Sequence, residues 1–288
     1  MHLVVDGPMY DCMLFETYLL SIINETYFSL NYNKDKLLIS AIEKLEEKMK
    51  KFHNGNYTFK FAEFGTRRRL SREWQKVVFG FLNKTNNCVG TSNVYLSSLY
   101  GTKPIGASAH EVIQIYQAID YSPIEFSNFY AMKDWYKEYN GNFGIALSDT
   151  LTTDLFLKDF DMQMSSIYNG VRNDSGDPYI WGEKIINHYK QLGIDPKKKT
   201  LLFSNNLTFD EAQKIYDYFK DKINVSFGIG TFCTNDTFVA PLNIVIKLQY
   251  VNDKPVAKLG DNYEKVMCQD RQYLEKIIQL VNSNLNWH

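Results

Sequence analysis

The chain has 288 residues and a formal net charge of −1, with 44% hydrophobic and 15% aromatic residues. This length accommodates one large domain, or one large and one small domain, and the apolar content excludes a disordered chain. The near-neutral charge offers no basic field, so a nucleic-acid partner is not expected.

The spacing of the cysteines and the length of the apolar runs predict where in the cell the protein is located. The four cysteines form no CxxC pair, which disfavours a zinc site or a disulfide framework and favours a reducing environment. They are Cys12, Cys88, Cys233 and Cys268. No stretch reaches the roughly 18 apolar residues of a membrane span, and acidic residues interrupt the start of the chain where a signal peptide would be apolar. We therefore expect a cytoplasmic protein without a membrane partner.

Strand-like runs alternate with amphipathic stretches along the chain. After a short β-like run, an apolar helix is predicted to about residue 28, and a helix rich in lysine and glutamate over 35–52. Apolar runs then end in glycine or polar residues near positions 65, 93, 110, 149, 174, 206 and 231. Helices are predicted between these runs, over 71–83, 109–120, 124–139, 152–158, 181–192 and 209–221. A hairpin around 252–253 and a helix over 269–283 follow.

This alternation predicts an α/β fold with a mainly parallel sheet. We interpret it as an α/β barrel over 1–241, followed by a C-terminal hairpin and helix over 242–288 that pack on the barrel. A doubly wound open sheet is the alternative, although no GxGxxG follows the first strand. In a barrel the strand ends converge on one face, so these polar ends predict the active face.

Arginine is scarce and clustered. Of the 32 basic residues only six are arginine, and four of those six are Arg67, Arg68, Arg69 and Arg72. The planar guanidinium suits phosphate or carboxylate recognition in a way that lysine does not. Because the cluster follows Phe64 where a strand becomes a helix, and a helix N-terminus also favours anions, the segment predicts anion binding. A solvated helix start is the alternative.

Two other strand ends carry candidate reactive groups. Of the five histidines, His110 alone follows a stretch rich in Gly, Ala and Ser, and both a catalytic and a structural role stay open for it. The turn 173–178 follows Arg172 and contains Asp174 and Asp177. Carboxylates combined with substrate phosphates are typical of Mg²⁺ sites. The alternative for this turn is the cap of the following helix.

A series of ordered strings between about residues 60 and 270 resembles the nicotinate phosphoribosyltransferase family. The strings are EFGTRRRLSRE, GTSN, AHE, GIALSDTLTTDLFLKDF, GVRNDSGDPYIWGEK, LGIDPKKKTLLFSNNL, SFGIGT, PLNIVIKL and KPVAKL. The resemblance implies a type II phosphoribosyltransferase fold, an irregular TIM-like α/β barrel with a smaller α/β domain. Residues 1–8 would be a remnant of that smaller domain, and the hairpin and helix over 242–288 would pack on it as well as on the barrel. The resemblance also implies a ligase-type enzyme of NAD biosynthesis. Such an enzyme joins nicotinate to phosphoribosyl pyrophosphate, with ATP as co-substrate and Mg²⁺ as cofactor. A homodimer with shared active sites is also implied.

The resemblance assigns roles to individual residues. His110 would be a phosphorylated catalytic histidine, acting with Arg172 and Asp174, and Mg²⁺ would be held through pyrophosphate by Asp174 and Asp177. Substrate contacts are implied for Phe64, Arg67, Ser92, Asp149, Gly176, Asn205, Gly228, Gly230 and Thr231. Among these, Phe64 and Arg67 would face the nicotinate ring and its carboxylate. The 5′-phosphate would lie against the glycines and Thr231.

Departures from the family pattern leave alternatives open. The family's N-terminal region, with a tyrosine that stacks on the pyridine ring, has no counterpart here, so a separately encoded N-terminal piece is one expectation. Asn205 stands where relatives have aspartate, and Phe232 where many have a basic residue. The alternatives are a truncated non-catalytic fragment or ligand-binding protein, and a phosphoribosyltransferase that uses nicotinamide. Arg67 favours the acid over the amide.

Overall fold

The computed structural model of the chain describes residues 3–262 and 266–285. It divides into two compact units, named unit 1 and unit 2 here. Unit 1 consists of Met1–Gly106, Asn206–Tyr216 and Phe227–Ile246, and unit 2 of Ala107–Asn205, Asp217–Ser226 and Lys247–His288. In the described part of the chain, no helix is long and apolar enough to cross a membrane.

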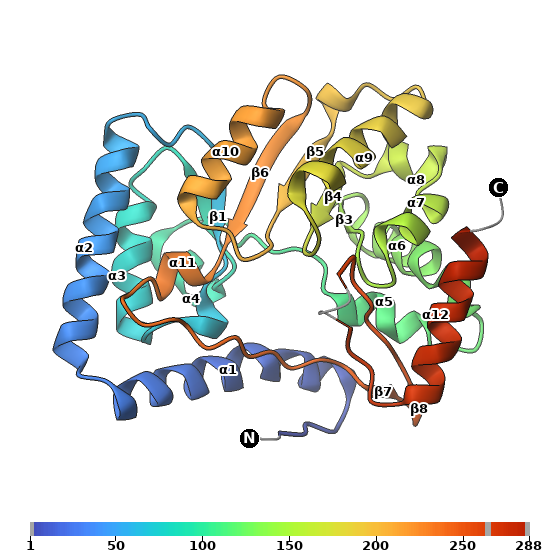
Figure 1. Ribbon diagram of the computed structural model, residues 1–288, viewed down its shortest axis with the longest axis horizontal. Helices are drawn as coiled ribbons and strands as arrows, with labels where there is room; N and C mark the ends of the chain where they lie inside the picture. Colours follow the sequence, from blue (N-terminus) through green and yellow to red (C-terminus); the bar gives the residue numbers. More distant parts are fainter. Residues whose placement is uncertain (1–2, 263–265, 286–288) are drawn as a thin grey trace. The chain divides into compact units, whose positions relative to one another are not determined.

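Unit 1 combines long helices with short parallel strands (Figure 1). Its first part contains α1 (Met9–Asn31), α2 (Lys34–His53), β1 (Phe61–Glu63), the 3-10 helix η1 (Thr66–Arg68), α3 (Arg72–Leu82), β2 (Cys88–Thr91) and α4 (Val94–Tyr100). Later segments add most of α10 (Phe209–Phe219), the end of β6 (Asn224–Ile229) and α11 (Thr231–Thr234). The strand order is β2-β1-β6, and both pairings are parallel. Figure 1 shows α2 and α3 side by side on one flank of these strands.

An aromatic cluster forms the core of unit 1. Its members are Phe52, Phe59, Phe61, Phe209 and Phe227, with neighbouring ring centroids 5.0–6.4 Å apart. The three strand or pre-strand rings among them are fully buried. Such rings bury large apolar areas, so this cluster fixes β1 and β6 and the loops that follow them.

Unit 2 contains the remaining parallel strands and most of the short helices. Its elements up to α9 are α5 (His110–Tyr116), η2 (Ile124–Phe126), α6 (Ser127–Tyr139), β3 (Ile145–Leu147), α7 (Thr153–Asp159), α8 (Met162–Ile167), β4 (Gly170–Asn173) and α9 (Pro178–Gln191). They are followed by η3 (Pro196–Lys198), β5 (Thr200–Phe203), β7 (Tyr250–Val251), β8 (Lys254–Pro255) and α12 (Arg271–Leu285). The strands pair in parallel in the order β5-β4-β3.

Helix α12 closes one side of the core of unit 2. Its Ile277 and Val281 pack with Leu155 of α7 and with Ala257 and Leu259, which follow β8. The segment after β8 is therefore held between α7 and α12. This burial fixes the backbone on either side of Lys258, a residue that lies at the functional cluster described below.

The residues of strand β6 are divided between the two units: its first part belongs to unit 2 and its last part to unit 1. Its Asn224 donates a backbone hydrogen bond to Lys199 within unit 2, and its Phe227 donates one to Lys60 within unit 1. The strand order of the sheet is β2-β1-β6-β5-β4-β3. The parallel strands and their intervening helices confirm the predicted α/β class.

Most predicted elements form within a few residues of the expected bounds, with specific exceptions. The expected strand before His110 is wrong: apart from a bridge between Thr91 and Pro104, the stretch up to α5 is irregular. Pro104 has no N–H to donate to a ladder, which explains the interruption. The short helices α4, α8 and α11 were not predicted. The hairpin is confirmed, with Asn252 and Asp253 at φ 48° and 60°. The domain boundary at residue 241 stays a prediction.

Candidate active site

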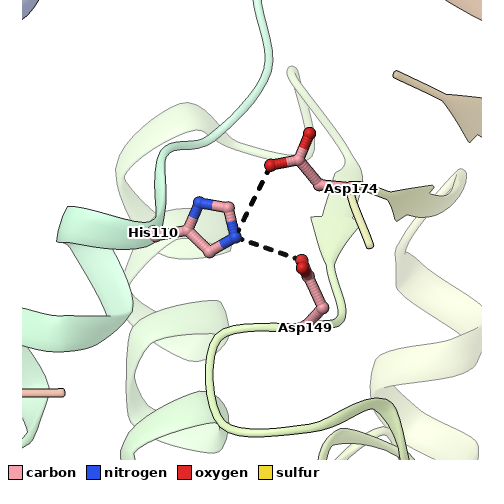
Figure 2. A group of neighbouring side chains, drawn as sticks. All are labelled: His110, Asp149 and Asp174. Carbon is pink, nitrogen blue, oxygen red and sulfur yellow. Dashed lines mark hydrogen bonds and ion pairs between the residues drawn. The ribbon is translucent and has the colours of Figure 1, made fainter. Parts of the chain in front are cut away.

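Three chain segments of unit 2 bring His110, Asp149 and Asp174 together. His110 is the first residue of α5, Asp149 follows β3, and Asp174 follows β4. Because β3 and β4 are parallel neighbours, with Leu147 opposite Arg172, their carboxyl ends lie at the same edge of the sheet. Figure 2 shows the imidazole Nε2 facing both carboxylates, 3.1 Å from Asp149 Oδ1 and 3.8 Å from Asp174 Oδ2.

Asp149 is almost completely enclosed, with 1% of its surface exposed. Its Oδ2 accepts hydrogen bonds from Ser175 Oγ at 2.6 Å and from Lys258 Nζ at 3.3 Å. Ser175 Oγ in turn accepts the peptide N–H of Asp261 at 2.9 Å. Burial opposes the charge of this carboxylate, but His110 and Lys258 hold the pKa of Asp149 well below its ordinary value. Asp149 is therefore ionised at neutral pH.

His110 is a buried, neutral imidazole. Burial lowers its pKa, against the opposing attraction of Asp149. An ionised carboxylate can only accept a hydrogen bond, so the proton of the ring lies on Nε2, toward Asp149. The lone pair is then on Nδ1, which makes that nitrogen the nucleophilic one.

Arg172, from β4, connects this cluster to neighbouring segments of unit 2. Its guanidinium donates to Asp174 Oδ1 at 3.1 Å, to Ser204 Oγ at 2.8 Å and to the carbonyl oxygen of Ser108 at 3.0 Å. Burial raises the pKa of Asp174, but the charges of Arg172, His110 and Lys258 together hold it below its ordinary value. A fixed guanidinium beside an ionised carboxylate suits a phosphate ligand that also carries a cation.

The turn after β4 has its own constraints. Gly176 adopts φ +75°, a conformation that favours glycine, and a Cβ there would lie 3.3 Å from the Asp261 Cβ. Asp177 is the N-cap of α9, where its Oδ1 accepts the N–H groups of Tyr179 and Ile180 at 2.8 and 2.9 Å. The structure thus places Asp177 at the helix cap, outside the group formed by the histidine and the two aspartates.

Unit 1 brings a second set of predicted residues together at the ends of β1 and β6. A Cβ at Gly228 would lie 2.5 Å from carbons of the Phe64 ring, and one at Gly230 would lie 3.0 Å from the Phe64 carbonyl oxygen. These glycines therefore make room for Phe64. Thr231 is buried at the start of α11, and Ser92 is exposed at the end of β2.

Two arginines in and after η1 are paired with carboxylates of α1. Arg67 lies 2.9 Å from Glu16 Oε1, and Arg69 lies 2.6 Å from Glu25 Oε1. The Arg67 side chain keeps 38% of its surface exposed. In the structure these arginines pair with carboxylates of the chain itself, and the predicted binding of a ligand anion stays a prediction.

Glu63, the last residue of β1, organises the loop that carries Phe64. It is fully buried and accepts the N–H of Gly65 at 2.5 Å, the hydroxyl of Thr91 at 2.5 Å and the amide of Gln75 at 3.2 Å. Burial raises its pKa, and these hydrogen bonds oppose that shift. Glu63 was not predicted from the sequence, because its partners come from separate segments.

Comparison with known proteins places the chain in a family. A model of the nicotinate phosphoribosyltransferase (NAPRTase) family matches residues 59–284. The chain belongs to this family. It is 43% identical over 285 residues to the nicotinate phosphoribosyltransferase of Chromobacterium violaceum, covering 96% of this chain and 71% of that protein. It is 42% identical to the Acinetobacter baumannii enzyme, covering 96% of this chain and 70% of that protein.

Solved structures of nicotinate phosphoribosyltransferases share the fold. The Vibrio cholerae structure aligns with a TM-score of 0.88 and 37% identity, covering 96% of this chain and 68% of that chain. The Porphyromonas gingivalis structure aligns with a TM-score of 0.86 and 34% identity, covering 96% and 72%. These matches confirm the resemblance that the ordered strings indicated.

Within this nicotinate phosphoribosyltransferase fold, the predicted residues fall into two sets. Unit 2 contains the connected residues: His110 contacts Asp149 and Asp174, and Arg172 contacts Asp174. Gly176 and Asn205 lie in the loops after β4 and β5. Unit 1 holds the substrate-binding candidates Phe64, Arg67, Ser92, Gly228, Gly230 and Thr231. Their individual roles stay predictions.

Ser175, Lys258 and Asp261 also lie at the cluster of this nicotinate phosphoribosyltransferase family member, and none of them was predicted from the sequence. Ser175 was visible inside the turn 173–178, but its contact with Asp149 depends on the β3–β4 pairing. Lys258 and Asp261 come from a segment far along the chain, and only the packing of that segment brings them to Asp149. The string KPVAKL contains Lys258, and this was the one signal available.

The side chains of the cluster fit a Mg²⁺ shared with a substrate better than one held by the three side chains alone. His110, Asp149 and Asp174 offer atoms within 4.8 Å of one another. However, Asp149 already accepts the ammonium of Lys258, and Mg²⁺ prefers oxygen over imidazole nitrogen. Asp174 is the most accessible of the three, with 25% of its side chain exposed. The donor set therefore fits a Mg²⁺ held by Asp174 together with substrate phosphates.

Proposed function

We propose that this chain joins nicotinate to the phosphoribosyl group of phosphoribosyl pyrophosphate, forming nicotinate mononucleotide for NAD biosynthesis. Two observations support the proposal. The chain belongs to this enzyme family, and its described residues include a connected cluster of His110, Asp149, Arg172 and Asp174. The family match favours this enzyme over a non-catalytic fragment and over a nicotinamide-using relative.

The phosphoribosyl step needs positioned charge rather than acid–base groups. The pyridine nitrogen forms a bond to the anomeric carbon, and the bond from that carbon to the pyrophosphate oxygen breaks, with its electron pair leaving on pyrophosphate. Arg172 supplies positive charge to the leaving group. Asp174 would hold Mg²⁺, which neutralises pyrophosphate when it is bound. The buried contacts of Arg172 with Ser108 and Ser204 hold its guanidinium in place.

Coupling to ATP would proceed through His110. Its Nδ1 lone pair attacks the terminal phosphorus of ATP, the phosphorus–oxygen bond breaks, and ADP leaves. Water later cleaves the phosphorus–nitrogen bond, releasing phosphate and restoring the imidazole. The supporting observation is the hydrogen bond of Nε2 with Asp149, which keeps the ring neutral, oriented and nucleophilic at Nδ1.

The nicotinate base would use the residues of unit 1. Phe64, held against Gly228, offers an aromatic face for the pyridine ring, and Arg67 offers a guanidinium for the carboxylate. Glu16 occupies Arg67 in the structure, so nicotinate would compete with an internal carboxylate. The amide nicotinamide carries no charge to compete in this way.

The test is product formation by the purified chain with nicotinate, phosphoribosyl pyrophosphate, Mg²⁺ and ATP, followed by chromatography. We expect nicotinate mononucleotide, with little or no product when nicotinamide replaces nicotinate. Binding of the substrates without any turnover would contradict the proposal and support a non-catalytic binding protein instead.

We further propose that two copies of the chain associate in the cytoplasm. Helix α1 carries Tyr10, Leu14, Tyr18 and Ile22 at four-residue spacing, and each has more than half of its surface exposed. A second copy of this chain would cover such a row. Light scattering should give a dimer mass that Leu14→Glu reduces to a monomer and that Val94→Glu, an exposed site on α4, leaves unchanged. A monomer mass for the unaltered chain contradicts the homodimer, and a separate N-terminal piece stays a prediction.

The state of the cysteines supports the proposed cytoplasmic location. All four cysteines are free thiols, and Cys233 is buried. Free thiols are typical of proteins in a reducing cytoplasm. Cell fractionation with detection of the native protein should find it in the cytoplasmic fraction, and recovery from an oxidising compartment would contradict this placement.

A further inference from the structure

Lys258 places an ammonium group in the interior of unit 2. Its backbone is fixed by a reciprocal pair of hydrogen bonds with Met267, at 3.0 and 2.8 Å, and by the N–H of Leu259, which donates to Thr150 at 2.8 Å. The side chain is 5% exposed. A buried ammonium is strongly unfavourable unless it is paired, so the position of this charge calls for an explanation beyond packing.

The charge of Lys258 is directed at the His110 cluster. Among residues 3–262 and 266–285, the acceptor of its ammonium is Asp149 Oδ2, at 3.3 Å. The other oxygen of that carboxylate accepts from His110. The same charge also lowers the pKa of His110 and contributes to lowering that of Asp174. Lys258 is thus the third member of a buried line in which an ammonium, a carboxylate and an imidazole follow one another.

A charge count shows why such a line matters for phosphorylation. Asp149 and Asp174 carry one negative charge each, and Arg172 and Lys258 carry one positive charge each, so the cluster is neutral with His110 uncharged. A phosphoryl group on His110 adds about two negative charges. Without Lys258 the cluster would already be negative before the transfer, and at short range in a buried site like charges repel strongly.

We propose that Lys258 is a positioning residue for phosphoryl transfer to His110: it fixes Asp149 and offsets its charge while the imidazole accepts the phosphoryl group of ATP. This inference rests on the proposed function. In the step, the terminal phosphorus–oxygen bond of ATP breaks, the phosphorus–nitrogen bond to His110 forms, and the electron pair leaves with ADP. Lys258 keeps its protons throughout and acts through Asp149.

The experiment separates phosphorylation from phosphoribosyl transfer. Lys258→Met keeps the length of the side chain and removes the charge. Lys254→Met is the matched control, because Lys254 lies nearby in the chain, on β8, and is half exposed. Each variant is tested for acid-labile label taken up from ATP labelled at its terminal phosphate, and for nicotinate mononucleotide formed without ATP. For Lys258→Met we expect labelling to slow by about 100-fold, the scale reported for loss of one preorganised electrostatic contact.

The two readouts distinguish a positioning role from a structural one. For Lys258→Met the ATP-free reaction should fall far less than the labelling rate, Lys258→Arg should restore part of the labelling, and Lys254→Met should match the unaltered chain in both. Labelling of Lys258→Met at the normal rate overturns the inference. An equal loss in both reactions also overturns it, since that result indicates general damage to the fold.

Further variants keep the test decisive if Lys258→Met does not fold. Removing both charges, in Asp149→Asn with Lys258→Met, should restore a folded chain, because an unpaired buried charge is costlier than its absence. In that background Lys258→Met should add little to the labelling defect of Asp149→Asn alone, as expected for two coupled residues, and a full independent loss overturns the inference. An unaltered chain that forms product but takes no label also overturns it, whereas one that forms no product fails the proposed function itself.

Discussion

The arginine segment of unit 1 and the His110 cluster of unit 2 both pair cations with carboxylates, yet they differ in burial. In the Arg67–Glu16 pair the side chains are 38% and 22% exposed, whereas Asp149 and Lys258 are 1% and 5% exposed. Water screens the first pair and weakens it. In the second, each charge depends on its partner, because an isolated buried charge is costly.

This difference explains how the two regions are suited to different tasks. A partly exposed arginine can exchange an internal carboxylate for that of a ligand at little cost, as nicotinate binding requires. A buried line of charges cannot lose a member, but it holds one imidazole in one protonation state and one orientation. Substitutions in the two regions should therefore differ in their effects on stability and on binding.

Asp149→Asn should give the largest loss of stability, because it leaves Lys258 buried without a charged partner. We expect the free energy of unfolding at pH 7 to fall by about 3 kcal/mol, measured by urea denaturation. The pKa of Asp149 is lowered by folding, so its contribution is present above the unfolded value of about 3.9 and is lost as the pH falls below it. The control Asp154→Asn breaks the exposed pair with Lys184 and should cost less than about 1 kcal/mol. Equal losses for both variants contradict the contrast.

Asp159→Asn should have the opposite sign. Asp159 is buried at the end of α7, and burial raises its pKa to about 7. Because the folded pKa exceeds the unfolded one, the charged form costs stability at pH 8, and the cost declines as the pH falls toward about 4. We expect the free energy of unfolding of the neutral variant to be about 2 kcal/mol higher at pH 8, and this gain in stability to shrink steadily toward pH 4. A gain independent of pH contradicts this assignment.

Gly228→Ala tests whether the Phe64 ring needs the space that this glycine leaves. The new Cβ would lie 2.5 Å from two ring carbons, so Phe64 must move. We expect a stability loss of about 1–2 kcal/mol and an increase of about fivefold in KM for nicotinate. Gly106→Ala is the control, since a Cβ there meets nothing within 4 Å. An unchanged KM in Gly228→Ala contradicts the role of Phe64 at the base.

Glu16→Gln should have the smallest effect on stability and an informative effect on binding. The loss of this partly exposed pair should change the free energy of unfolding by less than about 0.5 kcal/mol. Removal of the competing carboxylate should lower KM for nicotinate by about twofold, whereas Arg67→Ala should raise it by about tenfold. Glu25→Gln, which alters the Arg69 pair, serves as the control with no change in KM. A raised KM in Glu16→Gln would show that Glu16 assists binding rather than competing.

Much of the fold and part of the cluster followed from sequence patterns, for a physical reason. Parallel strands carry their polar residues at the same edge, so the strand-like runs that end near 149 and 174 predicted Asp149 and Asp174 as neighbours. His110 was predicted from its setting rich in Gly, Ala and Ser and from the family resemblance, and no regular strand directly precedes it. Long-range pairing has no such local signal. The partners of Arg67 and Asp149, namely Glu16 and Lys258, come from segments whose docking depends on the whole core.

Errors in the expected elements also have local causes. Pro104 interrupted the strand expected before His110. Asp177 occupies the cap of α9, which was the alternative interpretation of that turn, and its predicted role at Mg²⁺ stays a prediction. A carboxylate before a proline-initiated helix supports both interpretations equally until its hydrogen-bond partners are known.

The most direct test of the central claim is the intact mass of the purified chain after incubation with ATP and Mg²⁺, with peptide mapping under conditions that preserve phosphohistidine. We expect a gain of one phosphoryl group on the peptide that contains His110, and none in His110→Ala. A chain that makes nicotinate mononucleotide yet never gains this mass, or that gains it equally in His110→Ala, would contradict the role assigned to the His110 cluster.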